Sequence, residues 1–206
     1  KYQHMINKIY FSRLDYQETG EDTHHPLYIG YGNYMNDQTM DIYVYDWRSP
    51  IASIYYDYNL GPVAYQAPDG TITGHVALKR QYDIVNGDLH SYCDTQFSMV
   101  DEKLIQTLSA PSSGKMSEIA ETIGAEQNHI IRETDAKAVF VQGIAGSGKT
   151  IVALHRIAYL MYHGLKKRLH ANEVLVLSPH ALFSEYIEDV LPDLGEAKVL
   201  PLTLIE

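Results

Sequence analysis

The residues that most clearly indicate chemistry lie in one short segment, which matches the pattern G-x-x-x-x-G-K-[ST]. The segment consists of Gly143, Ile144, Ala145, Gly146, Ser147, Gly148, Lys149 and Thr150. Glycines let backbone N–H groups turn inward around phosphate oxygens, and a helix that starts there directs its positive dipole end at the same anion. Lys149 would neutralise the β- and γ-phosphates, and the Thr150 hydroxyl would bind Mg²⁺. The segment therefore predicts a nucleoside triphosphate and Mg²⁺ site, with Lys149 and Thr150 as catalytic residues.

A second informative side chain precedes this loop. Gln127 lies on a short predicted helix that leads to the strand before the loop. A glutamine amide can accept a hydrogen bond from N6 of adenine and donate one to N7, which would favour ATP over GTP. A glutamine on the surface of a helix, with no ligand, is an equally good interpretation.

The elements around the loop predict a parallel α/β sheet. Residues 138–141 form a short apolar run that predicts a buried strand leading into the loop. Residues 151–163 are apolar nearly all round and predict a buried helix. Residues 174–177 predict a second buried strand, and residues 181–191 a further helix. Strands and helices that alternate, without alternating polarity inside the strands, indicate a parallel sheet covered on both faces.

The first half of the chain is rich in tyrosine and in turn signals. Residues 25–95 predict a small antiparallel β unit, with hairpin turns at Pro68-Asp69-Gly70 and Asn86-Gly87-Asp88. The predicted strands are residues 27–34, 41–45, 51–58, 62–66, 71–78, 82–85 and 89 onward. Of the 17 tyrosines, 14 precede residue 100, and we expect them to form half-buried cross-strand pairs. A base-stacking surface is the alternative, which the scarcity of interleaved Lys and Arg disfavours.

Composition limits the class of protein. The chain has 206 residues, enough for one large or two small domains, and a formal net charge of −10, which argues against a strongly basic nucleic-acid-coating protein. Its single cysteine, Cys93, excludes an internal disulfide framework and a Cys-rich zinc site. We find no signal peptide and no apolar run of the roughly 20 residues that span a bilayer. A cytoplasmic protein without a membrane partner is expected, and the first residue, Lys1, suggests a fragment or a processed product.

Several segments resemble a known family. Residues 126–132 (EQNHIIR), the glycine-rich loop and residues 153–160 (ALHRIAYL) resemble the Q motif, the Walker A motif and the following helix of UvrD-like superfamily-1 helicases. Residues 46–53 (DWRSPIAS) and 78–82 (LKRQY) resemble more closely the HelD branch, which comprises RNA polymerase-associated helicase-like ATPases. The Walker A motif is common to many ATPases, so these last two segments are the ones that point to HelD.

The resemblance implies cofactors, partners and domains. ATP and Mg²⁺ would be the cofactors, and Gln127 would contact adenine. Ser178, Pro179 and His180 would form motif Ia, a loop that touches single-stranded nucleic acid in such helicases. DNA and RNA polymerase would be the partners of the complete protein, whose oligomeric state is left open. Residues 1–110 would form an accessory β-rich region, and residues 111–206 the first part of a RecA-like P-loop domain with an incomplete parallel sheet.

The sequence also departs from the family pattern. No Walker B run, four apolar residues ending in Asp-Glu, follows Thr150. The pair Asp101-Glu102 precedes the loop on a predicted helix and is interpreted as a solvated face. Without a Walker B carboxylate, the Mg²⁺ clamp and the base that orients water are missing. We therefore expect this chain to bind ATP weakly and not to hydrolyse it.

Three functions are consistent with these observations. The first is an ATP-driven superfamily-1 motor of the HelD type that remodels RNA polymerase or releases it from nucleic acid. The second is a conventional DNA helicase that unwinds duplex DNA. The third is a protein-binding module with a nucleotide-sensing P-loop. A buried tryptophan with a structural Asp–Arg pair is expected at Asp46, Trp47 and Arg48, where partner binding is the alternative.

Overall fold

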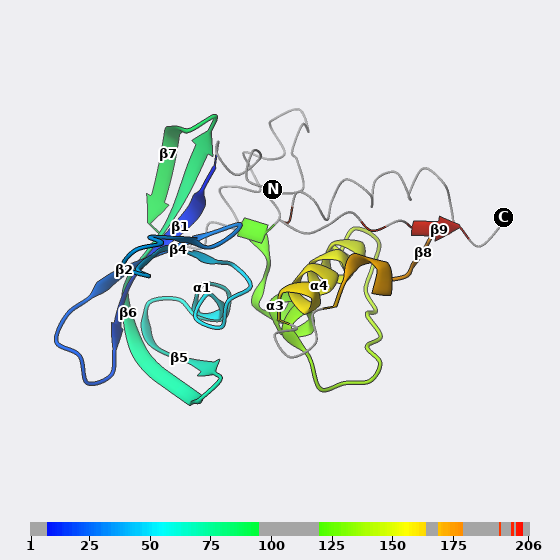
Figure 1. Ribbon diagram of the computed structural model, residues 1–206, viewed down its shortest axis with the longest axis horizontal. Coiled ribbons are helices and arrows are strands. Elements are labelled where there is room, and N and C mark those ends of the chain that lie inside the picture. Colours follow the sequence, from blue (N-terminus) through cyan, green and yellow to red (C-terminus); the bar gives the residue numbers. More distant parts are fainter. Residues whose placement is uncertain are drawn as a thin grey trace. The chain divides into compact units, whose positions relative to one another are not determined.

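The computed structural model describes residues 8–94, 120–163, 169–178, 194, 199 and 201–203 (Figure 1). The chain is α/β and divides into two compact units, residues 1–115 and residues 116–206. The helix predicted over residues 181–191 and the predicted helix that carries Asp101-Glu102 lie outside the described residues.

The first unit contains a mixed, largely antiparallel sheet with the strand order β3-β4-β2-β1-β6-β5, and β7 also pairs with β6. The strands are β1 (Tyr10–Glu18), β2 (His25–Gly30), β3 (Tyr34–Met35), β4 (Ile42–Asp46), β5 (Gly61–Ala67), β6 (Gly70–Val85) and β7 (Asp88–Asp94). Only β2 and β4 run parallel among these pairs. Both predicted hairpins are confirmed, because the Pro68-Asp69-Gly70 turn joins β5 to β6 and the Asn86-Gly87-Asp88 turn joins β6 to β7.

The long strand β6 organises this sheet. It pairs with β1 along one edge, while β5 and then β7 share its other edge (Figure 1). The two predicted strands over residues 71–78 and 82–85 are therefore one continuous strand. Strand β1 was not predicted, although its buried residues Ser12, Leu14 and Tyr16 alternate with more exposed ones. Phe11 is also buried and Ser12 is polar, so the residue types do not alternate regularly at the start of the strand, although one face packs on the core.

One predicted strand is wrong. Residues 51–58 contain the short helix α1 (Ser53–Asp57), with Ile54, Tyr55 and Tyr56 buried. Its start follows from local turns, since Ala52 donates its N–H to the Ser49 carbonyl and Ser53 donates to the Pro50 carbonyl. The tyrosine-rich composition favours a strand, but packing overrides such a preference readily.

Lys79 on β6 contacts the C-terminal end of α1. Its ammonium donates to the carbonyl oxygens of Tyr55 and Tyr58, with the Tyr58 contact at 3.0 Å, and lies 4.7 Å from the Tyr55 ring centroid. Burial lowers the pKa of Lys79 to about 8, because desolvation disfavours the charged form. The helix α1 is thus the place where two segments meet. Residues 46–53 precede and start this helix, and Lys79 of the segment 78–82 contacts its end.

A buried ion pair follows β4. Asp46 and Arg48 form two side-chain hydrogen bonds, from Nε to Oδ1 at 2.8 Å and from Nη2 to Oδ2 at 2.6 Å. Their side chains are only 3% and 5% exposed, and the neighbouring Trp47 is fully buried. Asp46 also accepts the Arg48 N–H, and its own N–H donates to Asn33 Oδ1. The structural role predicted for these residues is therefore confirmed.

The tyrosines behave largely as expected. Tyr10 packs edge-on against Tyr28, with ring centroids 4.9 Å apart, and against Tyr82 at 5.4 Å. Tyr10 and Tyr28 are half-buried and lie on neighbouring strands. Burial raises the pKa of Tyr10 and, to about 12, that of Tyr16. Tyrosine pairing across strands is thus confirmed.

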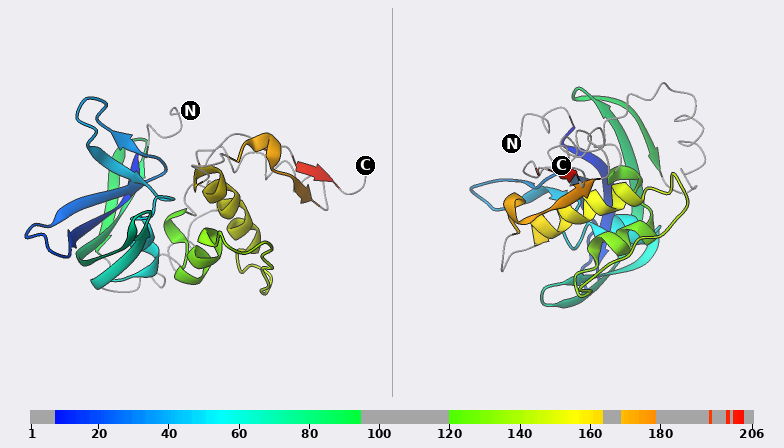
Figure 2. Two further views of the ribbon diagram at one scale, coloured as in Figure 1. Left: turned by 60° about the horizontal axis from the view of Figure 1, so that its bottom comes forward. Right: turned by 90° about the vertical axis from the view of Figure 1, so that its right-hand side faces the viewer.

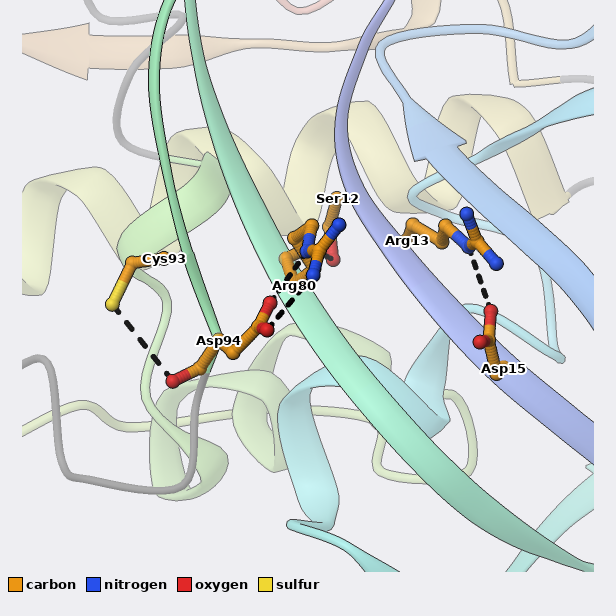
Figure 3. A network of polar contacts seen from close by, with 6 residues as sticks. All are labelled: Ser12, Arg13, Asp15, Arg80, Cys93 and Asp94. Atoms are coloured by element: carbon orange, nitrogen blue, oxygen red, sulfur yellow. Dashed lines mark hydrogen bonds and ion pairs between the residues drawn. The ribbon is translucent and has the colours of Figure 1, made fainter.

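A polar network ties β1, β6 and β7 together (Figure 3). Ser12 donates its hydroxyl to the Arg80 carbonyl, and the Arg80 guanidinium forms a bidentate pair with Asp94. The Arg80 guanidinium also lies 4.4 Å from the Tyr92 ring centroid. A separate pair, Arg13 and Asp15, projects from β1. These contacts bind the β6–β7 hairpin to the body of the sheet.

The described part of the second unit has two main helices, and Figure 2 shows them packed side by side: α3 (Ala125–Arg132) and α4 (Lys149–His163). A 3₁₀ turn, η2 (Ala171–Glu173), precedes β8 (Val176–Ser178), which pairs in parallel with β9 (Pro201–Thr203). The buried helix predicted over residues 151–163 is confirmed, since only Ala153 and His163 in it are exposed.

Both buried strands predicted in this unit need correction. Residues 138–141 are not in a strand, and Phe140 is 94% exposed. The second strand begins two residues later than predicted, at Val176, and Leu175 and Leu177 are 63% and 55% exposed. Apolar composition favours burial, but burial needs neighbouring strands and helices. In the described part of this unit, the sheet consists of the β8–β9 pair.

We expect Arg48→Met to lower the free energy of unfolding of the first unit by about 3–5 kcal/mol, because the buried Asp46 carboxylate loses its guanidinium partner. Fluorescence of Trp47, the single tryptophan, during chemical denaturation would measure this change. The matched control is Arg13→Met, which breaks a pair whose side chains are 30% and 25% exposed. That control should cost below about 1 kcal/mol. Equal losses in the two variants would contradict a special role for the buried pair.

Candidate nucleotide-binding site

The glycine-rich loop leads directly into α4. Residues 142–147 are exposed, and the helix begins at Lys149. Gly146 and Gly148 have φ angles of +83° and +79°, which L side chains rarely adopt. The backbone therefore reverses here in the way that turns N–H groups toward an anion.

A close approach also requires glycine at the start of the loop. A Cβ atom on Gly143 would lie 2.5 Å from Ser147 Oγ, so any side chain there would displace Ser147. The Ser147 N–H donates to the Ile144 carbonyl at 3.3 Å, which closes a tight turn between them. The predicted phosphate-binding residues Gly143, Ile144, Ala145, Gly146, Ser147 and Gly148 thus form one compact loop.

Lys149 folds back over this loop. Its ammonium donates to the carbonyl oxygens of Gly143 at 2.8 Å and Ile144 at 2.7 Å. Phosphate oxygens are charged acceptors and make stronger hydrogen bonds with an ammonium group than carbonyl oxygens do. An anion bound by the loop could therefore replace these carbonyl oxygens as the hydrogen-bond acceptor of the ammonium group.

Thr150 follows in the first turn of α4 and is half-buried. Its hydroxyl is a suitable single protein ligand for Mg²⁺, which keeps several waters and phosphate oxygens in most nucleotide sites. Among the described residues, no group of three or more His, Cys, Asp or Glu side chains could hold a metal ion. Thr150, in the first turn of α4 directly after the loop, is a residue that fits such a single contact with Mg²⁺.

Gln127 lies beside the loop. Its Oε1 accepts the Gly124 N–H at 3.1 Å, and its Nε2 is 3.5 Å from the Ser147 carbonyl oxygen. The structure thus brings together Gln127, Lys149 and the glycine-rich loop.

The two helices are held together by arginines that the sequence reasoning did not single out. Arg156 on α4 donates to the Ile130 carbonyl on α3 at 2.7 Å. Arg132 on α3 lies 5.2 Å from the Tyr159 ring centroid on α4 and donates to Asn128 Oδ1. Asn128 and Arg132 are four residues apart on one helix, so the sequence spacing could have predicted the hydrogen bond between their side chains. These contacts set the position of α3, and with it Gln127, relative to the loop.

His155 is fully buried on α4, one turn beyond the loop. Its Nδ1 is 2.8 Å from the Ile151 carbonyl oxygen, so Nδ1 carries the proton in the neutral ring. Burial lowers the pKa of His155 to about 4, although the bond to the Ile151 carbonyl opposes the shift. At neutral pH this side chain is an uncharged part of the core behind the loop.

The predicted motif Ia lies only partly within the described residues. Ser178 is buried at the end of β8, where it pairs in register with Thr203 on β9. Pro179 and His180 lie outside the described residues. A nucleic-acid-binding role for Ser178, Pro179 and His180 stays a prediction.

Comparison with known families identifies the first unit. The family model described as "DNA helicase IV HelD, N-terminal domain" matches residues 1–109, more than half of the chain. The chain belongs to the HelD family. This confirms the resemblance of residues 46–53 and 78–82, both of which lie inside the match. No curated protein matches the chain.

The HelD match and the candidate site occupy different parts of the chain. The match ends at residue 109, before Gln127 and the glycine-rich loop. The two segments that pointed to HelD have structural roles, since they build the buried Asp46–Arg48 pair and the Lys79 contacts with α1. In the described part of the chain, no helix is long and apolar enough to cross a membrane.

We expect the imidazole of His155 to titrate with a midpoint near pH 4, against about 6.5 in the unfolded chain. The unfolded state therefore takes up the proton first, and stability is lost as the pH falls from about 6.5 to about 4. The shift corresponds to about 3 kcal/mol. NMR titration of the His155 ring protons, in water and in urea, would measure both values. A folded-state midpoint above pH 6 would show that the ring is solvated.

Proposed function

We propose that this chain is the ATP-binding part of a HelD-type motor that uses ATP hydrolysis to remodel RNA polymerase or to release it from nucleic acid. The family match supports a helicase-like protein. The nucleotide-binding part of the proposal rests on the loop of residues 143–148. This loop contains two glycines with left-handed backbone and leads into α4, and the Lys149 ammonium donates to the loop's carbonyl oxygens. Gln127 beside this loop supports a preference for adenine.

In this proposal the chain's own residues divide the work of binding. Backbone N–H groups of the loop and of the first turn of α4 hold the phosphates, and Lys149 exchanges its two carbonyl contacts for phosphate oxygens. Thr150 offers its hydroxyl to Mg²⁺, which neutralises phosphate charge when it is bound. A Walker B carboxylate does not follow Thr150 in this sequence. We therefore expect binding without turnover by the 206 residues alone.

The proposal also assigns the two parts of the chain. Residues 1–110 form the accessory β-rich region, and residues 111–206 belong to a RecA-like P-loop domain with Q motif, Walker A motif and motif Ia. The parallel β8–β9 pair is consistent with such a domain. In a larger parallel sheet, the exposed apolar side chains of Phe140, Leu175 and Leu177 would be covered on both faces. A parallel sheet also places Ser178, Pro179 and His180 at a strand's carboxyl end, where α/β sheets bind ligands.

A DNA helicase is the second candidate. The matched family model carries the description DNA helicase IV. A conventional helicase would use the same nucleotide site to translocate on single-stranded DNA and to unwind duplex DNA. The two candidates differ in their macromolecular partner, so partner retention distinguishes them.

We expect the chain to bind Mg²⁺–ATP and Lys149→Met to weaken this binding at least tenfold, because a charge-assisted contact with the phosphates is lost. Isothermal titration calorimetry would measure both dissociation constants. The matched control is Lys137→Met, which removes an exposed lysine before the loop and should leave the affinity unchanged. No measurable ATP binding by the unaltered chain would refute the proposed site.

We expect the full-length protein to be retained on immobilised core RNA polymerase and to be released more readily when ATP is added. A parallel assay would measure the unwinding of a DNA duplex. Strong retention that ATP weakens, with little unwinding, supports the polymerase-directed motor. Robust unwinding without retention would refute the polymerase-directed motor and support the DNA helicase.

A further inference from the structure

The amide of Gln127 is engaged at both ends by the protein itself. Gln127 is the third residue of α3, and its Oε1 accepts the N–H of Gly124, the residue that caps the helix. Such a bond satisfies one of the donors left over at a helix N-terminus. The acceptor end of the amide is thereby oriented by α3, and the donor end is directed away from the cap.

The donor end of the same amide meets the glycine-rich loop. Nε2 is 3.5 Å from the Ser147 carbonyl oxygen, and a Cβ atom on Gly148 would lie only 3.0 Å from Nε2. Gly148 in turn accepts the Val152 N–H at 2.9 Å in the first turn of α4. Gln127 therefore touches the loop at the two residues where it turns into the helix.

We propose that Gln127 is a positioning residue for phosphate binding, in addition to any contact that it makes with adenine. The amide joins the capped end of α3 to the Ser147–Gly148 peptide, and so helps to hold the orientation of the N–H groups that face the phosphates. The packing of α3 on α4 keeps this link in place, through Arg156 and the Ile130 carbonyl. This inference rests on the proposed nucleotide site.

A positioning role and a base-reading role predict different ligand specificities. A residue that only reads adenine affects ATP but not a ligand without a base. A residue that orients the loop affects every ligand with phosphates by a similar factor. Inorganic tripolyphosphate, ATP and GTP, each with Mg²⁺, are therefore the ligands that separate the two roles.

The informative substitution is Gln127→Glu. A glutamate keeps an oxygen that can accept the Gly124 N–H, so α3 keeps its cap, but it replaces the donor facing Ser147 with a carboxylate oxygen. We expect the affinity for tripolyphosphate and for ATP to fall by a similar factor, at least about fivefold, which corresponds to one hydrogen bond. A change in the ratio of ATP to GTP affinity would report the adenine contact separately, because the loss shared with tripolyphosphate involves no base. His129→Ala, an exposed change on the same helix, is the matched control and should leave all three affinities unchanged.

Two further measurements keep the inference open to refutation. Gln127→Met removes both hydrogen bonds without adding charge, and it should show the same loss for tripolyphosphate. Without ligand, the backbone amide signals of Ser147 and Gly148 should shift in NMR spectra of both variants. Unchanged tripolyphosphate binding together with an ATP to GTP ratio near one would overturn the positioning role and leave Gln127 as a base reader. An unaltered chain that binds none of the three ligands would refute the nucleotide site itself.

Discussion

The backbone pairing of β6 is the constraint on which the first unit depends. A strand has two edges, and β6 uses both, with β1 paired to residues 74–81 on one side and β5 and β7 paired to residues 70–76 and 80–85 on the other. This pairing places Lys79 under the last carbonyl groups of α1 and Arg80 opposite Asp94. A slip of one residue would exchange the two faces of β6 and would separate both cations from their partners. The register of one strand therefore determines the helix contact, the hairpin contact and the core together.

In the second unit, the candidate site depends on the conformation of the glycine-rich loop. Its turns require left-handed backbone at Gly146 and Gly148, and its closure requires the absence of a side chain at Gly143. The loop is steadied by side chains from two helices, since Lys149 holds its first carbonyl groups and Gln127 approaches its last. Binding groups on an exposed loop need such support, because loop backbone alone is mobile. The HelD match lies in the first unit, and nucleotide binding is supported by this loop together with Lys149 and Gln127.

Local chemistry explains which elements could be predicted from the sequence. The helix α4 follows from its apolar composition, and the two hairpins follow from Pro-Asp-Gly and Asn-Gly-Asp turns, whose preferences act within a few residues. A buried Trp47 with a structural Asp46–Arg48 pair was also predicted, whereas the burial of the pair itself was not. Strand β1 and helix α1 were not predicted, because each is selected by partners distant in sequence, β6 for the strand and Lys79 for the helix. The buried strand predicted over residues 138–141 failed for the same reason.

The sequence by itself determined the phosphate-loop pattern, the HelD resemblance and the positions of the turns, because all three depend on residue types at short spacing. The tertiary structure decided the role of residues in the segments that carry the resemblance, which proved to be the buried ion pair and the contacts of Lys79 with α1. It also decided where the Gln127 amide lies and which surfaces are buried, including the exposure of Phe140. These features need groups from distant parts of the chain to meet, and only folding brings such groups within the few ångströms over which hydrogen bonds and packing act.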